Sequence, residues 1–382
     1  MESMKISRLS RLSMAIISML LFSVSAAVGA PLQISQVSHD PVVLDQSSEG
    51  KVLILYQLSA DAVTEVDFYD SRDQLIRTIS SDKYQHAGNH QTIWDGRDET
   101  GKLVTPNYYT YVIRAKGKDE KDIVYDLTDL TGGQPLTVPH TSYDSGQNQI
   151  EYILPAPSLV NIRIGLPNGG PLLGTLVDWV ARPGGHNSES WDGWDTGKVI
   201  NISEMKNYQI GVSAYALPNN SIIVMGEERL NRPVFIENSD SNDTIRQREK
   251  RRRKQMYNHW QHPRDKCYDP VIQLSMPQSS DKQIDGLPVI DKPIVITMDI
   301  REKDQAFTYD QRFEVVYYLD FVFVYEEELG YAPFNWRWDP HGVNEGVHYI
   351  TAMLRGYEGH FGTTTLKVFV KNPSTPQPLV EK

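Results

Sequence analysis

One cluster of side chains in this sequence could bind a soft metal ion: His259, His262 and Cys267. A His-x-x-His spacing can place two imidazoles on one face of a helix, and a thiolate is a ligand for zinc or copper. A structural zinc site is tetrahedral, however, and no fourth donor is obvious here. Because Pro263 would also interrupt a helix, we expect a polar linker and no cofactor, with a metal site as the alternative. Cys267 is the only cysteine and could instead form an intermolecular disulfide.

Carboxylates in a short loop raise the possibility of calcium. Asp95, Asp98 and Glu99 lie close together and offer oxygen ligands, of which calcium takes about six to eight. The related loop at 191–198 keeps only two carboxylates. We therefore expect a tight turn rather than a calcium site.

A basic run could attract an acidic protein, an anionic polysaccharide or lipid headgroups. Its basic residues are Arg246, Arg248, Lys250, Arg251, Arg252, Arg253 and Lys254. Runs of like charge are usually solvated linkers, and basic residues in an exposed linker are also sites for proteases. We expect a charged linker that acts as a hinge and is cut first by trypsin, with a docking site as the alternative.

Motifs for catalysis are absent from the sequence. It has no Gly-x-Ser-x-Gly, no His-Glu-x-x-His and no phosphate-binding glycine loop. Carboxylates are numerous enough for a glycosidase pair, but those that recur do so in turns. We expect a protein that is not an enzyme, and an accessory enzyme without a motif is an alternative.

The loops that carry these acids belong to an internal repeat. Trp94-Asp95-Gly96 returns as Trp191-Asp192-Gly193, and each copy continues to a second glycine, Gly101 or Gly197. The tryptophan should end a strand and point into a core. Asp-Gly supplies the positive φ that a tight turn needs, and the second glycine should close the loop. The same order of elements at nearly equal spacing predicts two copies of one domain.

Composition indicates an all-β protein. The 382 residues include 20 tyrosines and 7 tryptophans, and short alternating segments recur with Gly, Asp and Asn between them. This pattern predicts three tandem immunoglobulin-like or fibronectin III-like β-sandwiches, with a charged linker between the second and the third. The net charge of −11 argues against nucleic acid as a partner.

The organisation we expect begins with a signal peptide, because a basic start precedes an apolar run too short to span a membrane. No later stretch is apolar enough to be a transmembrane segment. The expected parts are a signal peptide at 1–30, sandwiches at 31–132 and 133–236, a polar and basic linker at 237–268, a third sandwich at 269–372 and a loose tail at 373–382. The stretch 221–225 is expected at an edge of the second sandwich.

The repeat resembles the immunoglobulin-like domain of the flagellar hook-capping protein. The resemblance rests on Gly88 and His90, on the stretch 94–102 and on the aromatic strand at 109–111. It extends less cleanly over 150–216, and Pro106 stands where that family usually has glycine just before the strand. The signal peptide and the lack of a recognisable hook-binding region argue against a hook cap itself.

The third domain is similar to bacterial immunoglobulin-like domains of surface proteins. In these, an aromatic segment ending in Trp-Asp, here Trp338-Asp339, precedes a Gly-x-His strand, here 346–348.

These features together predict an exported structural or binding protein, periplasmic or extracellular, that docks protein partners in an envelope or extracellular assembly. Trp179, Trp194 and Trp260 fit no core position of the repeat. Exposed aromatic residues stack on sugars or are buried by proteins, so a carbohydrate-binding or adhesive module is the second hypothesis.

Overall fold

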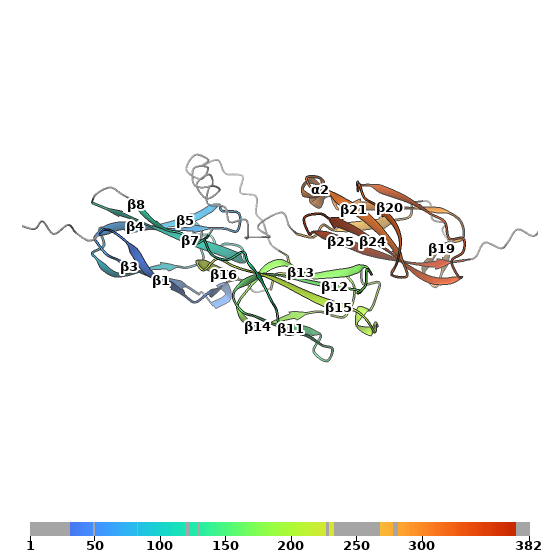
Figure 1. Cartoon of the computed structure of the whole chain (residues 1–382), viewed down its shortest axis with the longest axis horizontal. Helices are drawn as coiled ribbons and strands as arrows, with labels where there is room; N and C mark the ends of the chain where they lie inside the picture. Colours follow the sequence, from blue (N-terminus) through green and yellow to red (C-terminus); the bar gives the residue numbers. More distant parts are fainter. Residues whose placement is uncertain are drawn as a thin grey trace, which may run out of the picture.

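The computed structural model describes residues 31–48, 50–81, 83–118, 122–128, 130–226, 229–232, 268–277 and 282–371. In these residues strands predominate, and the only α-helix is α2 (Glu302–Tyr309). Three β-sandwiches follow one another along the long axis of the molecule (Figure 1). The all-β class and the three sandwiches expected from the sequence are confirmed. The signal-peptide region, most of the linker and the tail lie outside the described residues.

The first sandwich packs two sheets around Trp94, which is fully buried. Strand β3 shows why the sheet forms, because its apolar residues alternate and place Val52, Ile54 and Tyr56 on the buried face. One sheet has the order β1 (Ile34–Asp40), β3 (Val52–Leu58), β6 (Gly88–Trp94). The other has the order β2 (Val43–Asp45), β16 (Ser221–Met225), β7 (Asn107–Gly117), β4 (Ala62–Tyr69), β5 (Leu75–Ser80), and β8 (Asp122–Tyr125) also pairs with β7.

The position of β16 corrects the sequence expectation, which placed 221–225 at an edge of the second sandwich. The strand lies inside the first sandwich, antiparallel to β7 with Ile222 opposite Tyr109, and parallel to β2 with Ile223 opposite Val43. The physical reason is its composition. Ile222, Ile223 and Val224 are consecutive apolar residues and are all buried, which suits an interior strand better than a half-exposed edge. The chain therefore leaves the first sandwich, builds the second and returns.

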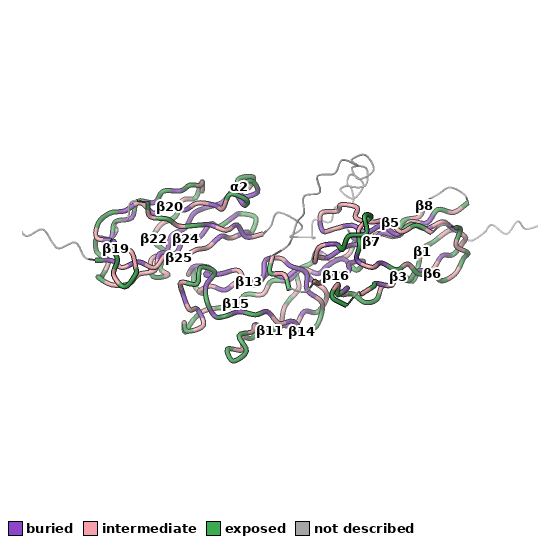
Figure 2. Tube along the Cα trace, turned by 180° about the vertical axis from the view of Figure 1, so that it is seen from behind, coloured by how far each residue is buried: buried purple, intermediate pink, exposed green. Residues whose placement is uncertain are grey.

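The second sandwich repeats the plan around Trp191. One sheet has the order β10 (Thr141–Asp144), β11 (Gln149–Leu154), β14 (Gly185–Ser190). The other has the order β13 (Leu172–Arg182), β12 (Ser158–Gly165), β15 (Gln209–Ala216), β9 (Pro135–Leu136). Buried and more exposed residues alternate along β11 and β15 (Figure 2), so these strands turn one face to the core, whereas β12 is buried along most of its length.

The third sandwich packs Trp336 and Trp338 from one sheet against Tyr317 from the other. Its smaller sheet has the order β17 (Ile272–Ser275), β20 (Ile294–Ile300), β23 (Phe334–Trp338). The larger has the order β18 (Gln283–Ile284), β19 (Leu287–Ile290), β25 (Phe361–Val370), β24 (Gly346–Gly356), β21 (Phe313–Leu319), β22 (Val322–Glu327). Strand β22 is therefore the last strand of this sheet.

Candidate functional site

The two repeated loops have the same internal scaffold. Trp94 is buried and its Nε1 donates to the carbonyl oxygen of Arg97 at 3.0 Å. Trp191 is also buried and its Nε1 donates to the carbonyl oxygen of Trp194 at 2.9 Å. Each tryptophan thus fills one end of its sandwich and fixes the loop that follows it.

The loop carboxylates accept hydrogen bonds from backbone amides. Asp98 Oδ1 accepts from the amides of Thr100 at 2.9 Å and Lys102 at 3.0 Å. Asp195 Oδ1 does the same in the second loop, from the amides at 199 and 200 at 2.6 and 2.7 Å. Asp95 and Asp192 each accept from the amide two residues ahead, at 3.3 and 3.2 Å. These acids hold turns. No group of three or more potential metal ligands occurs among the described residues.

Both turn glycines of the first loop match the expectation, whereas in the second loop only Gly193 does. Gly96 and Gly193 have φ of +71° and +85°, the positive values that an Asp-Gly turn requires, and Gly101 has φ +80°. Gly197 does not adopt a positive φ; Lys198 does, at +55°. The left-handed residue is the third after Asp98 in the first loop and the third after Asp195 in the second. Because the second loop is shorter, that residue is a lysine. The sequence expectation that Gly197 closes the loop is therefore wrong.

Other residues singled out in the sequence have simpler surroundings. Trp338 is buried at the end of β23. Asp339 accepts from the amide of His341 at 3.0 Å, and this hydrogen bond, followed by that from the His341 ring, lowers the pKa of Asp339. The metal candidates His259, His262 and Cys267 lie outside the described residues. The basic run at 246–254 does too, so the hinge and docking expectations stay predictions.

A buried carboxylate that the sequence analysis did not single out organises the junction between the second and third sandwiches. The carboxylate of Asp269 accepts from Arg163 Nη2 at 2.6 Å and Arg163 Nε at 3.2 Å, and from Thr175 Oγ1 at 2.5 Å. It also accepts from the amide of Phe361, in β25, at 2.8 Å. The Arg232 side chain donates to the carbonyl oxygen of Asp269. One residue therefore joins both sandwiches.

A second carboxylate, Asp178, completes this junction. A β-bulge in β13 aims it there, because Val160 pairs with Val180 whereas Ile162 pairs with Val177. Asp178 Oδ2 accepts from the amide of Asp269 at 2.8 Å. Burial, and then the charge of Asp269, raise the pKa of Asp178 to about 7. The sequence signal for this site is Asp178, a carboxylate within the apolar stretch 176–181. Its partner, Asp269, is far away in the chain.

A cleft of about 770 Å³ lies beside this junction. The second repeated loop lines one side, including Trp194 and Lys198, and residues 269–272 with Phe361, Thr363 and Thr364 line the other. The lysine ammonium pairs with the carboxylate of Asp192 at the rim, and this contact lowers the pKa of Asp192.

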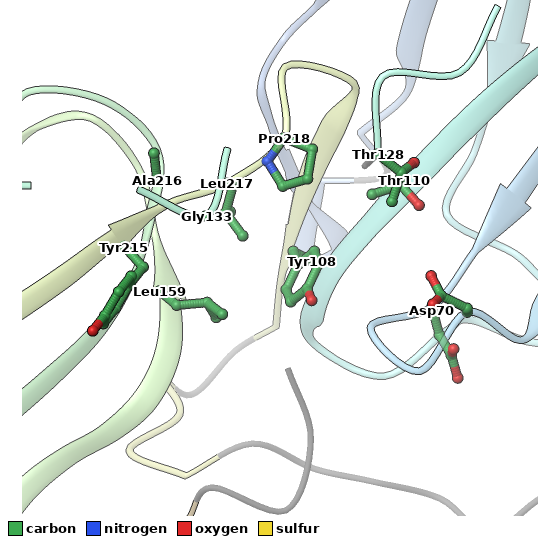
Figure 3. A pocket seen from close by; sticks show the side chains of 11 residues that line it. Asp70, Tyr108, Thr110, Thr128, Gly133, Leu159, Tyr215, Ala216, Leu217 and Pro218 are labelled. Atoms are coloured by element: carbon green, nitrogen blue, oxygen red, sulfur yellow. The ribbon is translucent and has the colours of Figure 1, made fainter. Parts of the chain in front are cut away.

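The junction between the first and second sandwiches has a smaller cleft, of about 380 Å³, with Pro106 on one side and Arg182 on the other. A second gap at this junction is smaller still. Figure 3 shows Tyr108, Leu159 and Leu217 around a gap of about 20 Å³. That volume is about the size of one water molecule, so the gap is a packing defect and not a ligand site.

Comparisons with known proteins do not assign a family. No family model matches the chain, and no curated protein matches it. Among solved structures, the fibronectin(III)-like modules of Clostridium thermocellum CbhA align over 92% of this chain and 100% of that chain, at 11% identity and a TM-score of 0.21. A bacterial ice-binding adhesin aligns over 90% of this chain and 99% of that chain, at 10% identity and a TM-score of 0.18. The tetra-tandem repeat of a large adhesion protein aligns over 89% of this chain and 74% of that chain, at 10% identity and a TM-score of 0.18.

With TM-scores this low, none of these likenesses carries an inference about this chain. The resemblance to the hook-capping domain stays a prediction. Separately, the described residues include no helix long and apolar enough to cross a membrane.

Proposed function

We propose that this chain is an exported, non-catalytic scaffold that docks a protein partner in an envelope or extracellular assembly. The periplasm and the cell exterior both fit this role. The repeated Trp-Asp-Gly loops support a relation of the first two sandwiches to hook-capping immunoglobulin-like modules. A structural role is also supported by the loop acids, which bind backbone amides and are not gathered for catalysis.

The observation that carries the proposal is the open edge of β22. In the described part of the chain this strand pairs with β21 alone. Val322, Phe323 and Val324 are 67%, 53% and 41% exposed. Natural edge strands are usually protected by lysine, proline, a β-bulge or a cover, because bare edges pair with other chains. Val324 forms a β-bulge, because Tyr317 pairs with Tyr325 and Tyr318 with Phe323. The start of β22 carries neither lysine nor proline, so it is suited to accept a strand from a partner.

The chemistry of β22 also suggests what the partner strand should look like. An added strand would place alternate side chains against the exposed valines and phenylalanine. Glu326 and Glu327 end the strand and would favour a basic residue opposite them. We therefore expect an extended segment with alternating apolar residues and a basic end.

The test compares two lysine substitutions in the full chain. Val324→Lys protects the edge of β22, whereas Val347→Lys alters a similarly exposed valine, at 45%, that pairs with Phe369 of β25 and is separated from β22 by β21. Proteins captured from envelope fractions would be cross-linked and identified for each variant. A specific partner should be lost with Val324→Lys and retained with Val347→Lys. Equal capture by both variants, or no partner with the unaltered chain, would contradict the proposal.

A further inference from the structure

The second repeated loop differs from the first where it meets the cleft. In both loops the residue after Asp-Gly supplies a backbone carbonyl to the buried tryptophan, from Arg97 or from Trp194. Since the backbone performs that role, the side chain is free to differ. The Arg97 guanidinium donates to the carbonyl oxygen of Gly101 at 2.8 Å and so closes its own loop. Trp194 instead lines the cleft and is 39% exposed. An exposed indole that the loop does not need is suited to contact a ligand.

Strained backbone marks the same rim. Lys198 and Asn148 line the cleft and both adopt the left-handed conformation, with φ of +55° and +54°. The first loop has glycine at the position of Lys198, so the strain belongs to the second loop alone. Unfavourable backbone conformations persist where the surrounding structure fixes them and are concentrated at binding sites. The carboxamides of Asn148 and neighbouring Gln147 add planar donors and acceptors to this rim.

The charged groups around the cleft are paired with one another. Asp192 pairs with Lys198 at the rim. Deeper in the cleft, Asp269 pairs with Arg163 at 2.6 Å, and Arg232 lies 3.6 Å from Asp178. A strongly charged ligand would have to break these pairs, whereas a neutral one with many hydroxyl groups could hydrogen-bond to them. The volume of about 770 Å³ is also within the range of small-ligand sites.

We propose that this cleft binds a neutral oligosaccharide, with Trp194 stacking against the apolar face of a sugar ring. Gln147, Asn148, Asp192 and Lys198 would bond the hydroxyl groups at the edge of that ring. This activity goes beyond the docking role proposed above and uses none of the residues of β22, so each proposal can fail alone.

The experiment titrates the full chain by calorimetry with neutral hexasaccharides of glucose, mannose and galactose, and with oligogalacturonate as an acidic probe. We expect one neutral series to bind, and Trp194→Ala to weaken its binding at least about tenfold, the effect of losing a stacked aromatic contact. Trp194→Tyr should retain part of the affinity because it keeps an aromatic face. Arg97→Ala, at the matching position of the first loop, should leave affinity unchanged, and so should Val324→Lys in β22.

Thermal unfolding of each variant separates binding from folding. Trp194→Ala should unfold within about 2 °C of the unaltered chain, because an exposed side chain contributes little to stability. If none of the neutral probes binds at millimolar concentration, if only the acidic probe binds, or if Trp194→Ala binds as well as the unaltered chain, the proposal is wrong. If Trp194→Ala lowers the unfolding temperature, the Trp194→Tyr variant provides the test. Complete loss of sugar binding by Trp194→Tyr, at normal stability, would also contradict the stacking role.

Discussion

The two junctions between sandwiches are held together by different kinds of contact. The first and second sandwiches share main chain, because β16 returns into the first sheet, and share an apolar cluster that includes Tyr108, Leu159 and Ile223. The second and third meet through the carboxylates of Asp178 and Asp269 and also through apolar contacts, because Phe321 and Tyr349 of the third sandwich pack against the core of the second. Apolar and main-chain contacts depend little on protonation, whereas buried carboxylates depend on it strongly. The first two sandwiches are thus joined by a shared strand, whereas the attachment of the third depends in part on titratable groups.

The largest expected effect concerns the first two sandwiches. A fragment of residues 31–132 lacks β16 and with it Ile222 and Val224, two buried residues of the first core. Removing each should cost about 2–5 kcal/mol, a large part of the 5–15 kcal/mol that typically stabilises a domain. We expect this fragment to show no cooperative urea unfolding by circular dichroism, whereas residues 31–232 unfold cooperatively. Equal cooperativity in the two fragments would show that the first sandwich folds without β16, contrary to the difference between the junctions.

The next largest effect concerns the repeated tryptophans. Trp94→Ala and Trp191→Ala should each destabilise the 31–232 fragment by about 3–5 kcal/mol, because both side chains are buried. If the two sandwiches are one unit, either variant should lower a single unfolding transition in urea. Two separate transitions, of which only one moves, would show that the shared strand does not couple them. Trp194→Ala is the control.

A smaller effect is expected at the titratable junction. Because the pKa of Asp178 is raised from 3.8 to about 7 in the closed junction, closure takes up a proton and is favoured at low pH. That advantage declines as pH rises from 3.8 and is gone above about 7. The ratio of closed to open junctions should fall roughly tenfold between pH 6 and pH 8. Small-angle X-ray scattering of the full chain should show a larger radius of gyration at pH 8.

Two other features bear on this measurement. Burial lowers the pKa of His360 near the junction, so this residue is already neutral over most of that pH range. Asp178→Asn should remove the pH dependence, and Asp339→Asn, at an exposed acid of the third sandwich, should preserve it. A radius of gyration that is constant with pH in the unaltered chain would contradict a titratable junction.

The smallest effect is expected in the second loop. Lys198→Gly removes the left-handed strain, which is worth about 1–2 kcal/mol, and loses an exposed ion pair worth about 0–1 kcal/mol. We expect a net gain of roughly 0.5–1 kcal/mol in urea unfolding. Gly101→Ala, the matched change in the first loop, should lose about 1 kcal/mol, since it introduces the same strain. A loss for both variants would mean that the lysine contributes more than its strain costs.

Local pattern explains what the sequence predicted well. Alternation in stretches such as 52–58 and the Asp-Gly turns are set by neighbouring residues, so strands, sandwiches and the φ values of Gly96 and Gly193 could be foreseen. The position of β16 could not, because it depends on pairing with a strand far away in the chain. The site around Asp178 and Asp269 was missed for the same reason. The left-handed conformation of Lys198 was missed because the two loops were aligned by their glycines and not by the distance from Asp98 and Asp195.

The return of β16 also fixes the order in which the molecule can be completed. When the chain leaves a ribosome or crosses a membrane from its N-terminus, β7 emerges well before β16, with the whole second sandwich between them. The pairing of Ile222 with Tyr109 must therefore wait, and contacts between such distant segments form slowly. The second sandwich can close on its own strands and, by doing so, bring the ends of this long connection together. The first sandwich is therefore synthesised first but completes its folding after the second sandwich.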